Sequence, residues 1–185
     1  MDSAAIEKNR AATKYSPNEQ WWRVLWSFGA VVFRWSPRPC FGFRRWLLRQ
    51  FGAKVGHHVH IYPSTKIYFP WNLKIGDLSS IGEWALIYNL GVVTIGDRAT
   101  LSQNVHVCAG THDYTDAALP LIKTPISIGQ SAWVCADAFV GPGVCIGEGA
   151  VVGARSVVVK NIPAWTVAAG NPARVIKKRI LRGTE

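Results

Sequence analysis

His112 is the side chain of this sequence best suited to proton transfer at neutral pH. It lies in the run Cys108-Ala109-Gly110-Thr111-His112-Asp113-Tyr114, directly before residues 113–127, which interrupt an otherwise regular pattern. An imidazole can take a proton from a hydroxyl group and return it later, and histidine is the commonest general base in proteins. The position of His112 between a rigid element and a covering loop therefore predicts that it is a catalytic base. The alternative is an ordinary surface histidine at the start of a loop.

Basic residues near the C-terminus form a second candidate site. Arg174, Lys177 and Lys178 follow the pair Asn171-Pro172. Asparagine is a favourable N-cap and proline is tolerated in the first helical turn, so we expect a short helix within the C-terminal extension, residues 164–185. Cations on this helix would bind phosphate groups, and a solvated basic helix is the alternative.

A six-residue repeat of aliphatic side chains provides the frame for both candidate sites. Fifteen positions, all Ile, Leu or Val, recur at steps of six, with two short insertions and one longer interruption. These positions are Val55, Ile61, Ile67, Ile75, Ile81, Ile87, Ile95, Leu101, Val107, Ile128, Val134, Val140, Ile146, Val152 and Val158. Glycine follows the aliphatic residue at eight of the fifteen positions.

The repeat predicts a coil of short parallel strands rather than a sandwich of hairpins. Residues two apart in a strand share a face, so each aliphatic residue points inward together with the small residue two places before it. The glycine permits a backbone turn that a Cβ atom would hinder. Turns of such a coil bury a core only by stacking on their neighbours, and insertions become loops on one face. We therefore expect residues 55–163 to form the coil and residues 113–127 to leave it as a loop.

These residues resemble the hexapeptide-repeat acyltransferases, whose pattern is aliphatic-Gly-x-x-small-x. More narrowly, the chain is similar to the colanic-acid-biosynthesis type of acetyltransferase over roughly residues 45–180. The similar runs are Pro70-Trp71-Asn72-Leu73, Leu101-Ser102-Gln103-Asn104, Gly110-Thr111-His112-Asp113-Tyr114, Pro120-Leu121-Ile122 and Gly170-Asn171-Pro172-Ala173. The resemblance implies an all-β fold, a left-handed parallel β-helix with three hexads per turn. Grouped in threes, the hexads make about five turns: 55–74, 75–94, 95–112, 128–145 and 146–163.

The resemblance also implies an activity and a set of site residues. The activity is transfer of an acetyl group from acetyl-coenzyme A to a hydroxyl of a sugar or polysaccharide precursor, with His112 as general base. The residues expected to bind the coenzyme are Trp133, Ala136, Ala154, Arg155, Arg174, Lys177 and Lys178. The residues expected at the acceptor are Trp84, Tyr88, Asn89 and Asp113, and either Asp113 or a main-chain carbonyl would orient the imidazole. An acyltransferase with a non-sugar acceptor and a non-catalytic β-helix scaffold are the alternatives.

The resemblance further implies a homotrimer with each site between two subunits, and direct transfer without an acyl-enzyme. We expect no metal. Three histidines hold zinc in the related γ-class carbonic anhydrases, and no histidine triplet with that spacing occurs here.

Residues 1–54 precede the repeat and are aromatic and basic, above all residues 17–50. Pro37 and Pro39 divide residues 17–50 into two expected helices. One interpretation is a cap over the open end of the coil, where strand edges need protection. The other is peripheral contact with a membrane through residues 17–50, which would bring the enzyme to lipid-linked sugars.

The charge of the chain lies at its two ends. The formal net charge is +10, but residues 55–170 carry six basic and seven acidic residues. This nearly neutral centre and the lack of a recognisable binding motif argue against a nucleic-acid partner. The four cysteines have no C-x-x-C spacing and no signal peptide is recognised, so we expect a cytoplasmic protein with reduced thiols, in one interpretation peripheral at the inner face of the membrane.

Overall fold

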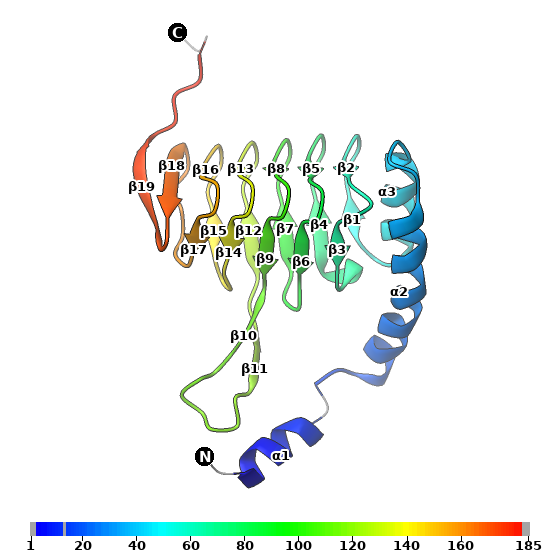
Figure 1. Cartoon of the computed structure of the whole chain (residues 1–185). Helices are drawn as coiled ribbons and strands as arrows, with labels where there is room; N and C mark the ends of the chain where they lie inside the picture. Colours follow the sequence, from blue (N-terminus) through cyan, green and yellow to red (C-terminus); the bar gives the residue numbers. More distant parts are fainter. Residues whose placement is uncertain (1–2, 13, 183–185) are drawn as a thin grey trace.

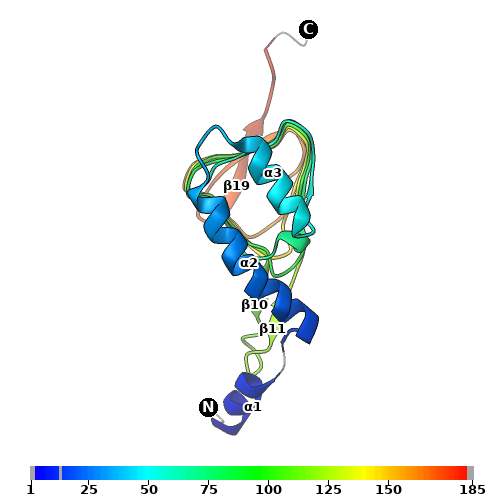
Figure 2. The ribbon, with the colours of Figure 1, turned by 90° about the vertical axis from the view of Figure 1, so that its right-hand side faces the viewer.

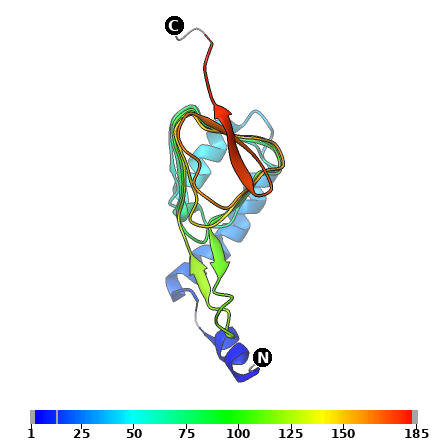
Figure 3. The same cartoon turned by 90° about the vertical axis from the view of Figure 1, so that its left-hand side faces the viewer.

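Aliphatic side chains at six-residue spacing fill a three-sided coil in the computed structural model, which describes residues 3–12 and 14–182 (Figure 1). All fifteen repeat positions are buried, and none is more than 8% exposed. The short parallel strands lie in three sheets that enclose this core as a triangular prism (Figure 3). The prediction of a parallel β-helix is confirmed.

Each turn of the prism contributes one strand to each sheet. The first sheet contains β1 (Lys54–Val55), β4 (Leu73–Ile75), β7 (Val93–Ile95), β12 (Ile126–Ile128) and β15 (Cys145–Ile146). The second contains β2 (His60–Ile61), β5 (Ser80–Ile81), β8 (Thr100–Leu101), β13 (Trp133–Val134), β16 (Val151–Val152), β18 (Thr166–Gly170) and β19 (Ala173–Lys178). The third contains β3 (Lys66–Ile67), β6 (Leu86–Tyr88), β9 (His106–Cys108), β14 (Phe139–Val140) and β17 (Val157–Val158). The five predicted turns match this grouping.

The repeat glycines are required for close approach between turns rather than for left-handed backbone. A Cβ atom on Gly76 would lie 2.5 Å from the backbone nitrogen of Asp97 in the next turn, too close for any side chain. The left-handed positions are instead occupied by other residues at the prism edges. Along the edge between the second and third sheets, φ is between 57° and 61° at Trp84, Asn104, Asp137 and Arg155. We call this edge the donor edge, because the residues expected to bind the acetyl donor lie on or beside it.

The interruption of the repeat is a β-hairpin that projects from the edge between the third and first sheets (Figure 1). It consists of β10 (Gly110–His112) and β11 (Leu121–Lys123), which pair antiparallel. The expected loop 113–127 therefore begins three residues too late, because Gly110 already pairs with Lys123. It also ends too late, because Ile126 and Ser127 pair with β7. We call residues 110–123 the arm.

Three helices precede the prism: α1 (Ser3–Ala11), α2 (Pro17–Trp35) and α3 (Phe41–Gln50). Helices α2 and α3 lie across the first turn, at one end of the prism (Figure 2). The buried guanidinium of Arg44 donates to the carbonyl of Ile61, and Trp26 Nε1 donates to the carbonyl of Ile67. These bonds satisfy carbonyl groups of the first turn. Within the described residues, no helix is long and apolar enough to cross a membrane.

The C-terminal extension corrects one prediction. In place of the expected short helix, residues 173–178 form β19, which pairs antiparallel with β18 (Figure 3). Residues 166–170 extend the second sheet beyond β16, and their remaining edge offers hydrogen bonds that a helix would leave unmade. The pair Asn171-Pro172 is the turn of this hairpin, not the start of a helix.

Candidate active site

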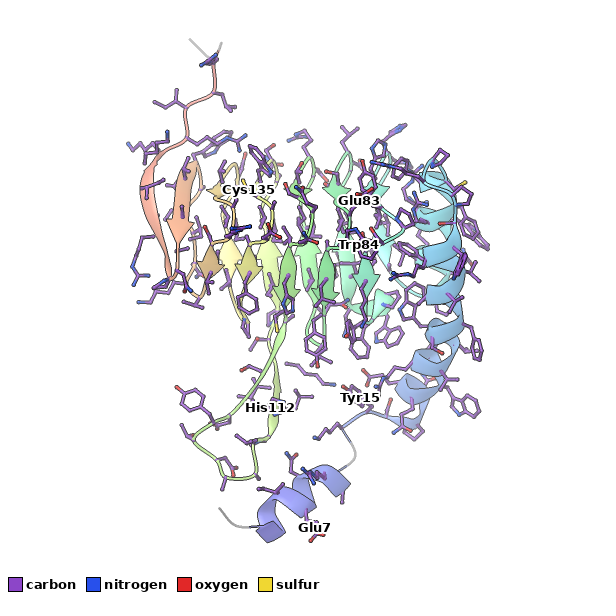
Figure 4. The ribbon with its side chains drawn as sticks, in the orientation of Figure 1. Glu7, Tyr15, Glu83, Trp84, His112 and Cys135 are labelled. Carbon is purple, nitrogen blue, oxygen red and sulfur yellow. The ribbon has the colours of Figure 1, made fainter. Side chains whose placement is uncertain are left out.

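His112 is the last residue of β10 and lies on the arm, exposed to solvent (Figure 4). Its Nδ1 atom is 2.6 Å from the main-chain oxygen of Leu119, on the returning side of the arm. A carbonyl oxygen only accepts hydrogen bonds, so Nδ1 carries the ring proton in the neutral imidazole. The lone pair is then on Nε2, which can accept a proton from a substrate.

Asp113 does not orient the imidazole. Its Oδ1 atom accepts hydrogen bonds from the main-chain nitrogen and the hydroxyl of Thr115, at 2.9 and 2.6 Å. The hydroxyl bond and then the main-chain bond lower the pKa of this carboxyl group. Of the two predicted partners of the imidazole, the main-chain carbonyl is therefore confirmed. The sequence does not identify Leu119 as the source of this carbonyl, because every residue has a main-chain oxygen.

The N-terminal segment contacts the arm, and no pattern in the sequence predicts this contact. The side-chain amide of Asn9, in α1, donates to the main-chain oxygens of Ala118 and Leu119. The Lys123 ammonium is 4.6 Å from the ring centroid of Tyr15. Helix α1 therefore contacts the same part of the arm that holds the His112 ring.

Tyr88 lies beside the base of the arm. It is in register with Cys108 on the adjacent strand, and its ring meets that of Tyr68 at 4.8 Å. Burial, followed by the neighbouring Tyr15, Cys108 and Tyr68, raises the pKa of the Tyr88 phenol. The neutral phenol is thus favoured, and it can donate a hydrogen bond to an acceptor.

Asn89 has a different role from the one predicted. Its side chain is fully buried, its Oδ1 accepts from the main-chain nitrogen of Phe69, and its Nδ2 donates to the oxygen of Phe69. Both polar ends of the amide are therefore occupied within the frame. This corrects the expectation that Asn89 contacts the acceptor.

Trp84 is separated from His112 within one chain. It lies on the donor edge and is 58% exposed, while His112 lies on the arm at a different edge (Figure 4). The guanidinium of Arg34 lies 5.3 Å from its ring centroid.

The residues predicted to line the coenzyme groove gather on and beside the donor edge. Ala136 accepts a main-chain hydrogen bond from Arg155, which stacks the corner at Ala154 on the corner at Ala136. Trp133 is 45% exposed on the adjoining sheet, and its Nε1 atom donates to the hydroxyl of Ser102 at 2.9 Å. Arg155 is exposed, and its guanidinium is 3.9 Å from the Asp137 carboxylate.

The basic residues of the C-terminal extension follow on the same sheet. Arg174, Lys177 and Lys178 are exposed on β19, which is the last strand of the second sheet. The three cations remain accessible to an anion, although they lie on a strand and not on the predicted helix.

The structure thus divides the predicted residues into two groups. His112, Asp113 and Tyr88 lie on or beside the arm, whereas Trp84, Ala136, Ala154 and Arg155 lie on the donor edge. The whole width of the third sheet separates the two edges (Figure 3). Within a single chain, the predicted site residues therefore lie at two different edges of the prism. Among the described residues, no group of three His, Cys, Asp or Glu side chains is arranged to hold a metal ion.

A six-residue-repeat prism with a histidine on a projecting arm defines the class of hexapeptide-repeat acyltransferases. No family model matches the chain. The chain is 46% identical over 158 residues to a protein of Escherichia coli K12 named as the colanic acid biosynthesis acetyltransferase WcaF, covering 85% of this chain and 87% of that protein. It is 32% identical to the galactoside O-acetyltransferase of the same organism, covering 73% of this chain and 68% of the other.

Solved structures agree with this assignment. A maltose O-acetyltransferase from Clostridium difficile 630 has a TM-score of 0.80 at 28% identity, covering 96% of this chain and 98% of that one. A galactoside acetyltransferase in complex with coenzyme A has a TM-score of 0.82 at 28% identity, covering 95% and 90%. The chain belongs to the hexapeptide-repeat acetyltransferase family, and its β-helix is left-handed like those of its relatives.

Proposed function

We propose that this chain transfers an acetyl group from acetyl-coenzyme A to a hydroxyl group of a saccharide, with His112 as the general base. The observation that carries the proposal is the bond from His112 Nδ1 to the oxygen of Leu119. That bond fixes the ring on the arm and leaves the basic nitrogen, Nε2, for the acceptor hydroxyl.

The reaction follows from this arrangement. Nε2 of His112 takes the hydroxyl proton while the hydroxyl oxygen attacks the thioester carbonyl. A C–O bond forms, the tetrahedral intermediate collapses, and the C–S bond breaks. The imidazolium then returns its proton to the departing thiolate, so that the products are the acetyl ester and free coenzyme A.

The donor would lie along the donor edge and the second sheet. Trp133, Ala136 and Ala154 offer an exposed aromatic ring and stacked corners for the pantetheine arm. Arg155, Arg174, Lys177 and Lys178 offer cations for the phosphates. The coenzyme A complex of the galactoside acetyltransferase supports this part of the proposal.

The complete site would form between subunits of a homotrimer. Within one chain the arm and the donor edge lie at different prism edges. A threefold axis can place the arm of one subunit beside the donor edge of the next, and repeat this contact three times. The saccharide would then contact Tyr88 beside the arm and Trp84 on the neighbouring subunit.

The sugar acceptor is supported by the relatives named for galactoside, maltose and colanic acid. The direct experiment is release of free thiol from acetyl-coenzyme A in the presence of a panel of soluble saccharides. We expect release with at least one saccharide, and His112→Ala should lower turnover by roughly 10²- to 10⁴-fold. Tyr114→Ala is the matched control, because Tyr114 lies on the same arm and is 88% exposed.

Three outcomes would contradict the proposal. Activity of His112→Ala within about threefold of the parent would remove His112 from the role of base. Thiol release with amines but with no saccharide would show that the acceptor is an amine and not a saccharide hydroxyl. No thermal stabilisation by coenzyme A would favour a non-catalytic scaffold, because a ligand that binds the folded state stabilises it.

A further inference from the structure

The outward face of α2 is apolar from Trp21 to Trp35, although the helix is already buried on its opposite side. Trp26, Gly29 and Phe33 form the buried stripe. The outer face consists of seven residues that recur at helical spacing, and each of them is at least 51% exposed. These seven residues, which we call the outer face, are Trp21, Val24, Leu25, Phe28, Val31, Val32 and Trp35.

The apolar surface continues from α2 onto α3. Val31, Val32 and Trp35 line a shallow groove together with Phe43, the latter in α3. Phe43 and Trp46 are exposed neighbours, with ring centroids 5.9 Å apart. An exposed apolar surface of this extent on a folded domain marks an interaction site.

The charged residues of α2, α3 and the segments next to them are almost all positive. Residues 17–54 contain seven Lys or Arg and one acidic residue, Glu19. A second groove runs between α2 and the first turn of the prism, and its charged lining residues are Arg23, Arg34 and Lys66, with no acid among the residues that line it. A cationic groove thus lies directly beside an apolar stripe.

We propose that the outer face docks on an anionic lipid surface, with its aromatic and aliphatic side chains among the acyl chains and lipid phosphates in the cationic groove. This inference goes beyond acetyl transfer and does not depend on it. Indole rings favour the boundary between headgroups and acyl chains, and Trp21 and Trp35 lie at the two ends of the stripe. A helix with an apolar face and adjacent cations lies in the plane of that boundary.

A second copy of the chain is a poorer occupant of this face. A twofold contact is self-complementary, so pairing two outer faces would bring the cationic grooves of both copies together without acids to compensate them. A threefold assembly also fits a lipid surface. Rotation about a threefold axis preserves direction along that axis, so the same end of every prism would face the same way.

The test is sedimentation of the full chain with vesicles of phosphatidylcholine, with or without about 30% phosphatidylglycerol. We expect binding to the anionic vesicles that weakens as salt is added. The triple variant Leu25→Gln/Phe28→Gln/Val32→Gln should reduce binding by about tenfold or more. Arg34→Gln/Lys66→Gln should reduce it by about thirtyfold at low salt, since each cation near such a surface contributes about a factor of five.

The matched control is Leu78→Gln/Ile176→Gln/Ile180→Gln, which removes three exposed aliphatic side chains outside α2 and α3. This variant should sediment like the parent. A parent chain that stays in solution with anionic vesicles at low salt overturns the proposal, as does a triple α2 variant that binds like the control. Light scattering that shows self-association of the parent and its loss in the triple α2 variant, without vesicle binding, would assign the face to a second copy instead.

Lipid binding and acetyl transfer are measured separately. Thiol release with a soluble saccharide should be the same for the parent and the triple α2 variant, because Leu25, Phe28 and Val32 lie outside both halves of the active site. Absence of thiol release would refute the proposed activity and leave the vesicle result intact.

Discussion

The imidazole Nδ1 of His112 and the main-chain oxygen of Leu119 lie 2.6 Å apart across the arm. The same oxygen accepts a second hydrogen bond, 3.2 Å long, from the side-chain amide of Asn9. The orientation of the ring therefore depends on a carbonyl that is itself held by the N-terminal helix.

Asn9→Ala should lower kcat by about fivefold, the factor that corresponds to one ordinary hydrogen bond. The KM for acetyl-coenzyme A should not change, because the Asn9 amide donates to two carbonyls of the arm and the coenzyme is proposed to lie along the donor edge. Steady-state kinetics with a saccharide that supports thiol release measures both values. Glu7→Ala, on the same helix and exposed, is the control. Equal kcat values for the two variants would show that Asn9 does not position the arm.

Mixing two inactive variants should restore activity if each site needs two subunits. His112→Ala damages the arm, and Ala154→Trp places a bulky ring at an exposed corner of the donor edge. A mixed trimer contains interfaces with an intact arm facing an intact edge, so co-expression should recover a measurable fraction of the parent's thiol release. Ala164→Trp changes an exposed alanine at a corner of a different edge and should remain active. No recovery in verified mixed trimers would place both halves of the site in one subunit.

Arg44→Met should lower the free energy of unfolding by roughly 3 kcal/mol, because it leaves one buried and three partly buried acceptors without their donor. The buried guanidinium donates to Ile61, Ser36, Pro37 and Arg38, and burial lowers its pKa. Urea denaturation followed by circular dichroism measures the change. Arg45→Met removes one hydrogen bond, to Val59, and should have a smaller effect. The role of Arg44 would be refuted if both variants lost the same stability.

His106 should make the folded state less stable in mild acid. Burial lowers the pKa of this imidazole, which packs edge-on against Phe139. As the pH falls through the unfolded pKa of about 6.5, the unfolded chain binds the proton first, so stability decreases until the folded pKa is passed. His106→Gln should therefore show a smaller fall in urea midpoint between about pH 7.5 and pH 5.5 than the parent. His57→Gln, an exposed position, is the control, and an equal fall in all three proteins would contradict this account.

The sequence predicted the β-helix well, because the six-residue step of the aliphatic residues marks the positions that point into its interior. Fifteen aliphatic residues at a fixed step specify an interior, and each of them is buried. The helices on either side of Pro37 were also predictable, because proline limits where a helix can continue.

Features set by tertiary contacts were not predictable in this way. Local preference at Asn171-Pro172 favours a helix start, but the open edge of β18 pairs with residues 173–178 instead. The burial of Asn89 and the contact of Asn9 with the arm depend on residues more than fifteen positions away. The separation of the predicted residues between two prism edges was not evident from the repeat, since spacing along the chain does not reveal which prism edge a corner occupies. Only the family resemblance implied a site between two subunits.

The antiparallel direction of β19 has a consequence for how these molecules meet end to end. A stack of parallel strands can in principle grow without limit by adding identical units, as a filament does. Because β19 runs antiparallel to β18, a further copy could not continue the parallel pairing of the second sheet at that end. At the other end, the arginines of α3 donate to carbonyls of the first turn. The coil is thereby terminated at both ends, and its length is fixed by its own sequence.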